Sequence, residues 1–166
     1  MARQVILSAL LALAAAANST ESVQNDAIHF LEAAAKHSLI YLIRHGENQT
    51  TTWKNFGFTS LYYPNFDCDT NKHDRACQTL GPLSQATGIP LTSTYDVDDD
   101  DSGVAKAIVK AAANGPVLLA WEHKGLSDIA DDLNGASKDY PGDEFDLIWT
   151  FDTDKSKFLV DSYENC

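Results

Sequence analysis

Basic residues are scarce in this sequence. Its 166 residues include 12 Lys and Arg against 24 Asp and Glu, which gives a formal net charge of −12. Arginine occurs only as Arg3, Arg44 and Arg75. Because an acidic chain repels polyanions, we expect neither nucleic acid nor an anionic membrane as a partner. Two arginines beyond the N-terminus can still form a small positive site, of a size suited to one phosphate group.

Long apolar runs are absent after the N-terminus. No later stretch approaches the roughly 18–20 apolar residues that a transmembrane helix needs. Residues 1–4 are basic, and Val5–Ala17 is a nearly unbroken run of apolar and small residues that ends in an A-x-A site. We therefore expect residues 1–17 to be a secretory signal peptide, cleaved near Asn18, rather than a membrane anchor. Residues 18–166 are then expected to form a single secreted domain without a membrane contact.

Cysteine is limited to Cys68, Cys77 and Cys166. The sequence has no C-x-x-C motif and no Cys/His spacing typical of a structural zinc site. In a secreted chain the simplest arrangement of three cysteines is one disulfide and one free thiol, and the sequence leaves the pairing open. Sequons at Asn18 and Asn48 fit a secreted glycoprotein.

Two short apolar runs, Leu39–Ile43 and Val117–Trp121, are typical of strands that are buried on both faces. The first run is followed by Arg44–Gly46, and the second by Glu122–His123. In a parallel sheet, ligands bind in the crevice beyond the carboxyl ends of the strands. Both histidines are therefore expected at one edge of the sheet, close to each other.

The rest of the chain alternates between helical and strand patterns, which predicts an α/β domain with a mainly parallel sheet. We expect Pro82 to kink or split one of these helices and Ser102 to cap another. Residues 48–74 are rich in aromatics but show no clear period, so their packing is left open. The predicted helices are 22–37, 75–87, 103–113 and 126–133, and the further strands are 89–91, 145–151 and 157–160.

Three motifs in this order resemble the histidine phosphatase superfamily, also called the phosphoglycerate mutase-like family. They are R-H-G at Arg44–Gly46, R-A-C-Q-T at Arg75–Thr79 and W-E-H at Trp121–His123. The F-D-L-I-W-T segment at Phe145–Thr150 is similar to secreted members of the family. The resemblance implies a three-layer α/β/α fold with a mainly parallel central sheet. The family's L-[ST]-x-x-G helix has no counterpart in 48–74.

The resemblance also implies roles for the matched residues. His45 would be the catalytic nucleophile that becomes phosphorylated, and Arg44, Arg75 and His123 would bind the phosphoryl oxygens. The implied activity is that of a phosphohydrolase acting on phosphate monoesters through a phosphohistidine. Its partner would be a small phosphorylated substrate, and this chemistry requires neither a metal nor another cofactor.

Two points stay open at this stage. The proton for the leaving group would come from Glu122 or from the acidic segment Asp96–Asp101. Because neighbouring strand residues point to opposite faces, Glu122 could face away from a site that contains His123. The alternative function is a catalytically impaired relative that keeps the fold and binds anions, since 48–74 lacks the family's pocket helix. The oligomeric state is not predicted.

Overall fold

In the computed structural model, the described residues are 39–46, 53–65, 74–97, 102–134 and 138–164. All of them belong to one compact unit, Lys36–Cys166. The predicted signal peptide, the predicted helix at 22–37 and both sequons lie outside the described residues.

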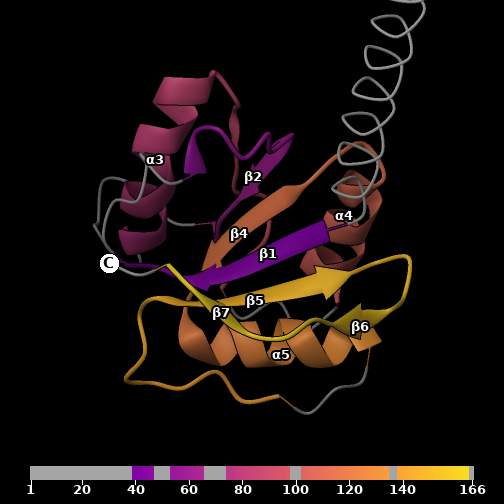
Figure 1. Ribbon diagram of the computed structural model, residues 1–166. Helices are drawn as coiled ribbons and strands as arrows, with labels where there is room; N and C mark the ends of the chain where they lie inside the picture. Colours follow the sequence, from indigo (N-terminus) through magenta and orange to yellow (C-terminus); the bar gives the residue numbers. More distant parts are fainter. Residues whose placement is uncertain (1–38, 47–52, 66–73, 98–101, 135–137, 165–166) are drawn as a thin grey trace, which may run out of the picture. The chain divides into compact units, whose positions relative to one another are not determined.

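The described residues form an α/β fold around a mixed, mostly parallel sheet of seven strands (Figure 1). Its strand order is β3-β2-β4-β1-β5-β6, and β7 pairs with β5. The strands β1 to β4 run parallel to one another, whereas β5 is antiparallel to β1, β6 and β7. The strand bounds are β1 Leu39–Arg44, β2 Ser60–Tyr62, β3 Leu91–Thr92, β4 Val117–Trp121, β5 Leu147–Asp152, β6 Lys157–Phe158 and β7 Ser162–Tyr163.

The two apolar runs form strands, as predicted, and they lie at the centre of the sheet. β1 and β4 pair in parallel, and the register places Arg44 opposite Trp121. Both strands are almost fully buried, which is why their sequences are continuously apolar rather than alternating. The expectation of an α/β domain with β1 and β4 ending at the same edge is confirmed.

Three helices among the described residues cover the two faces of this sheet (Figure 1): α3 Arg75–Thr87, α4 Gly103–Ala112 and α5 His123–Asn134. Successive residues of a strand point to opposite faces, so β1 contributes to two separate cores. Tyr41 and Ile43 pack in one cluster with buried residues of α3. Ile40 and Leu42 pack in the other cluster with buried residues of α4 and α5.

Helix α3 has the predicted bounds and is not split at Gly81-Pro82, so of the two predicted outcomes, a split or a kink, only the kink stays a prediction. A proline inside a helix costs about 3 kcal/mol because it removes one backbone hydrogen bond and crowds the preceding turn. The buried face of α3, which includes Leu80 and Leu83, packs on the sheet and outweighs this cost.

The aromatic segment 48–74 contains a strand that its sequence does not predict. β2 has only three residues, too few to show a period, yet it pairs with both β4 and β3. The aromatic rings of Trp53, Phe56 and Phe58 surround Tyr41 of β1, with ring centroids 4.9–6.1 Å from that of Tyr41. The segment therefore packs against the sheet on the same face as α3.

Several predicted boundaries were wrong by a few residues. β3 begins at Leu91 rather than at 89, and β7 was not predicted. Helix α5 begins at His123 rather than at 126, so only Glu122 separates it from β4. Ser102 is the N-cap residue of α4, but its hydroxyl makes no cap hydrogen bond and donates to Oδ1 of Asp132 at 3.0 Å instead.

The structure also bears on the predicted absence of a membrane span and on the expected disulfide. Among the described residues, no helix combines the length and the apolar character required to cross a membrane. No disulfide occurs among the described residues, and Cys77 lies on α3. Because Cys68 and Cys166 lie outside the described residues, the expected disulfide stays a prediction.

Candidate active site

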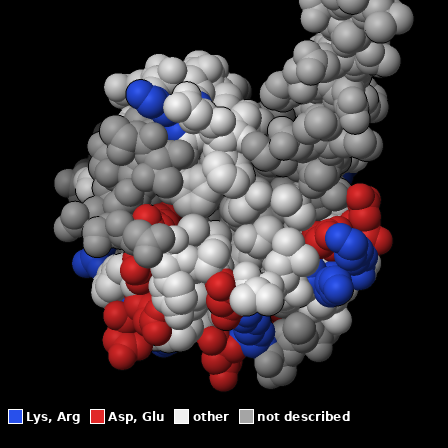
Figure 2. All heavy atoms as spheres, in the orientation of Figure 1, with Lys and Arg blue, Asp and Glu red and all other residues white. Residues whose placement is uncertain are grey.

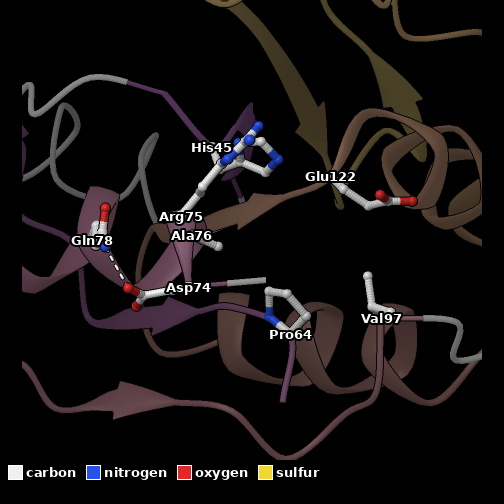
Figure 3. A pocket seen from close by; sticks show the side chains of 8 residues that line it. All are labelled: His45, Pro64, Asp74, Arg75, Ala76, Gln78, Val97 and Glu122. Carbon is white, nitrogen blue, oxygen red and sulfur yellow. Dashed lines mark hydrogen bonds between the residues drawn. The ribbon is translucent and has the colours of Figure 1, made fainter. Parts of the chain in front are cut away.

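Two adjoining cavities open at the carboxyl ends of β1 and β4, and we call them the first and the second lobe. The first lobe has a volume of about 530 Å³ and the second about 570 Å³. The two lobes share His45, Arg75 and Gln78, so they form one site divided by these residues. The first lobe is also lined by Pro64, Asp74, Ala76, Val97 and Glu122 (Figure 3), and the second by Gly46, Phe145, Asp146 and Glu164.

His45 follows the last residue of β1 and is held by the neighbouring strand. Its backbone N–H donates to the carbonyl oxygen of Trp121 at 3.0 Å, which extends the β1–β4 ladder by one residue. Burial of the imidazole, and then the positive charges of Arg44 and Arg75, lower the pKa of His45 below its usual value. The imidazole of His45 is therefore neutral near pH 7, with a ring nitrogen lone pair available.

Arg75 and Glu122 bring opposite charges to His45 from two other elements. Arg75 is the exposed first residue of α3, and Figure 3 shows its side chain beside the imidazole of His45. Glu122, which follows β4, lines the first lobe across from them, and its charge acts to raise the pKa of His45. The structure thus brings these three predicted site residues to one lobe, and in Figure 3 the carboxylate of Glu122 lies on the side of that residue away from His45.

A buried threonine connects the turn after β1 to the start of α3. The N–H of Gly46 donates to Oγ1 of Thr79 at 3.1 Å. The hydroxyl of Thr79 lies 2.8 Å from the carbonyl oxygen of Arg75 and 3.0 Å from that of Gly46, and its one proton serves either. Sequence reasoning missed this residue, although Thr79 stands in the R-A-C-Q-T motif, four positions after Arg75.

Arg44 takes a different direction from His45, because adjacent strand residues point to opposite faces of the sheet. Its guanidinium Nη1 donates to the carbonyl oxygens of Gly142 and Glu144. The guanidinium carbon lies 3.7 Å from the centroid of the Phe145 ring. Arg44 is not among the described residues that line either lobe. Its predicted role in phosphate binding stays a prediction.

His123 lies at the start of α5, near the same loop that contacts Arg44. A methyl group on Gly142 would lie 3.7 Å from Cδ2 and Nε2 of the His123 ring. Like Arg44, His123 is not among the described residues that line the two lobes. The five predicted site residues therefore form two groups, one at the lobes and one beside Gly142.

Val97, in the wall of the first lobe opposite His45, accepts a hydrogen bond from the indole of Trp121. Nε1 of Trp121 donates to the carbonyl oxygen of Val97 at 3.2 Å. Gly125 packs against the same indole so closely that a Cβ there would lie 2.5 Å from its Cδ1. Val97 and the adjoining Asp96 are the described part of the predicted acidic segment; residues 98–101 lie outside the described residues.

The described residues offer no cluster of metal ligands. In the ranges that the structure describes, no group of three or more His, Cys, Asp or Glu side chains could hold a metal ion. Of the residues in the first lobe, Asp74 accepts a hydrogen bond from the side-chain amide of Gln78.

Comparison of the chain with protein-family models gives no match, and comparison with curated proteins gives none either. What the chain does is therefore inferred from the residues at the two lobes, from their placement and from the resemblance of the motifs.

Proposed function

We propose that the chain is a secreted phosphohydrolase that cleaves phosphate monoesters through a phosphohistidine intermediate on His45. One observation carries this proposal: His45, Arg75 and Glu122, from three separate elements, line one cavity (Figure 3). They supply an imidazole nucleophile, a guanidinium that binds phosphoryl oxygens and a carboxyl group for proton transfer. Secretion rests on the predicted signal peptide, residues 1–17.

The lowered pKa of His45 supports its role as the nucleophile. A neutral ring nitrogen attacks phosphorus, so that the N–P bond forms while the ester P–O bond breaks. Arg75 stabilises the negative charge on the phosphoryl oxygens, and Glu122 supplies the proton that the departing alcohol oxygen takes up. Water then attacks the phosphohistidine and gives a proton back to Glu122, which releases inorganic phosphate and returns both side chains to their starting states.

We also propose that the fold is the three-layer α/β/α arrangement of phosphoglycerate mutase-like proteins. The placement of α3 on one face of the sheet and of α4 and α5 on the other supports this proposal. The order of the R-H-G, R-A-C-Q-T and W-E-H motifs supports it as well.

A second candidate is a catalytically impaired relative that keeps the fold and binds anions. The observation in its favour is the engagement of Arg44 by the carbonyl oxygens of Gly142 and Glu144, which leaves Arg75 as the one arginine among the described lining residues. A site with one guanidinium binds phosphate more weakly than a site with two.

Hydrolysis of an aryl phosphate between pH 4 and 8 separates the two candidates. The phosphohydrolase predicts activity that falls on the order of 10³-fold or more in His45→Ala. The matched control is Lys110→Ala, an exposed residue on α4 that should leave the rate unchanged. Activity that survives His45→Ala contradicts the phosphohistidine mechanism. Phosphate binding without hydrolysis, in both proteins, identifies the impaired relative.

A further inference from the structure

The second lobe is not needed for the chemistry described above, since Glu122 lies in the first. It is slightly larger than the first lobe and shares the wall of His45, Arg75 and Gln78 with it. A phosphoryl group bound at this wall is open to both lobes. The ester oxygen of a bound phosphate monoester can therefore lie at this wall, toward Glu122 in the first lobe, while the rest of its alcohol portion extends into the second lobe.

Phe145 gives the second lobe an aromatic surface. Its side chain is 51% exposed, a large value for a phenylalanine next to a buried strand. The guanidinium carbon of Arg44 lies 3.7 Å from the centroid of the ring, so Arg44 covers one face of the ring, and Arg44 is not among the described residues that line the lobe. Arg44 is itself held by two carbonyl oxygens, and its contact with the ring favours this orientation of Phe145.

Two carboxylates set the charge of the second lobe. Asp146 follows Phe145 in the chain, and Glu164 is held by the indole of Trp53, whose Nε1 donates to its Oε1 at 3.1 Å. Arg75, on the shared wall, is the one basic residue among the described residues that line this lobe. A second anionic group on the substrate would meet both carboxylates and be repelled.

We propose that the second lobe binds the alcohol portion of the substrate, and that this portion is an uncharged aromatic ring that stacks on Phe145. The inference rests on the proposed function, because it places the phosphoryl group at His45 and Arg75. A cavity of about 570 Å³ holds an aryl group. The substrate class is thus an aryl phosphate monoester with one phosphate and no further negative charge.

Binding of non-hydrolysable phosphonates, measured by calorimetry on the intact chain, tests this inference without requiring turnover. Phenylphosphonate should bind about tenfold or more tightly than methylphosphonate, because one aromatic ring stacks on another. Phe145→Ala should remove this difference in affinity between the two phosphonates. Phe145→Leu keeps the apolar bulk without the ring, and it should retain only part of the preference for phenylphosphonate over methylphosphonate. Val160→Ala is the matched control, since Val160 is 92% exposed and does not line the lobe.

A carboxylated ring tests the role of charge. Phosphonobenzoate should bind more weakly than phenylphosphonate, because its carboxylate is repelled by the carboxylates of the lobe. Asp146→Asn removes one of these charges and should reduce the difference in affinity between the two compounds. Equal binding of the phenyl and methyl compounds, or a ratio that Phe145→Ala leaves intact, would overturn the inference. A retained phenyl preference in a chain that hydrolyses no ester would overturn the proposed hydrolysis alone. Failure to bind either phosphonate would overturn both proposals.

Discussion

At the scale of single residues, the site depends on a hydroxyl that the sequence does not single out. The motifs predicted His45, Arg75 and Glu122, because each stands directly after a recognisable apolar strand or at a helix start. Thr79 was not predicted, because its partner, the backbone of Gly46, is distant in sequence and meets it only in the folded chain. The direction of Arg44 was missed for the same reason, since the carbonyl oxygens that hold it belong to a distant loop.

We expect Thr79→Val to weaken phosphate binding roughly tenfold while the chain stays folded. Valine has the shape of threonine but leaves the N–H of Gly46 without its partner, so the turn that carries His45 loosens relative to Arg75. Thr79→Ser keeps the hydroxyl and should restore affinity. The measurement is phosphate affinity by calorimetry, with melting temperature as the check on folding. A valine variant that binds as tightly as the serine variant would show that the hydroxyl does not position the site.

The pH dependence of the site follows from the lowered pKa of His45. Its neutral form, the nucleophile, predominates above the folded-state pKa, so activity should persist below pH 6.5 and fall only as the pH drops through that lower value. Removing a nearby positive charge by Arg75→Gln should raise the pKa of His45 toward its usual value.

NMR titration of the His45 ring measures this pKa directly, whether or not the chain is active. Lys124→Gln removes an exposed positive charge that is not among the groups that shift His45, and it serves as the control. A pKa of His45 at or above 6.5 in the unmodified chain would contradict the account.

At the scale of helices and strands, prediction worked where an element has a long, uniform pattern. β1, β4 and α3 were located correctly because five or more buried or periodic residues identify each of them. β2, β3 and β7 have two or three residues, and such short segments are strands only because a neighbour offers hydrogen bonds. The N-terminal end of α5 was missed because its first turn, His123–Gly125, has little helix propensity of its own.

Two glycines in helices should respond to alanine in opposite ways. Gly81→Ala, in α3, meets nothing within 4 Å outside its chain neighbours, so helix propensity should raise the free energy of unfolding, by at most about 0.5–1 kcal/mol because the ring of Pro82 crowds a Cβ at the preceding residue. Gly125→Ala, in α5, would place a methyl group 2.5 Å from the indole of Trp121 and should lower that free energy by about 1–3 kcal/mol.

Urea denaturation of the two alanine variants measures both changes. Because the indole of Trp121 also holds Val97 at the wall of the first lobe, Gly125→Ala should weaken phosphate binding as well. Equal stability changes of the same sign in the two variants would contradict the close packing at Gly125.

At the scale of the whole molecule, the acidic balance of the sequence is visible on the surface. On the face drawn in Figure 2, acidic side chains gather over the lower half, and basic side chains are few and separated. Among the described residues that line the two lobes, the acidic ones also outnumber the arginines: they are Asp74, Glu122, Asp146 and Glu164 against Arg75. The long-range field therefore opposes an approaching dianion, and only the local charges at the shared wall attract it.

Salt should therefore increase the efficiency of the reaction. Raising the ionic strength from about 0.01 M to 0.15 M shortens the screening length from about 30 Å to 8 Å, which removes the long-range repulsion and leaves the contact with Arg75. We expect kcat/KM for an aryl phosphate to rise severalfold over this range, and to rise less in Asp146→Asn. A fall in kcat/KM with added salt would show that the positive charge at the site dominates instead.

The central claim is that His45 becomes covalently phosphorylated. The direct measurement is mass spectrometry of the chain after brief incubation with an aryl phosphate and quenching in alkali, in which phosphohistidine is stable. The account predicts one added phosphoryl group on the peptide that contains His45, and none in His45→Ala. Hydrolysis with a phosphoryl group on another residue, or with no covalent intermediate while His45→Ala remains active, would contradict it.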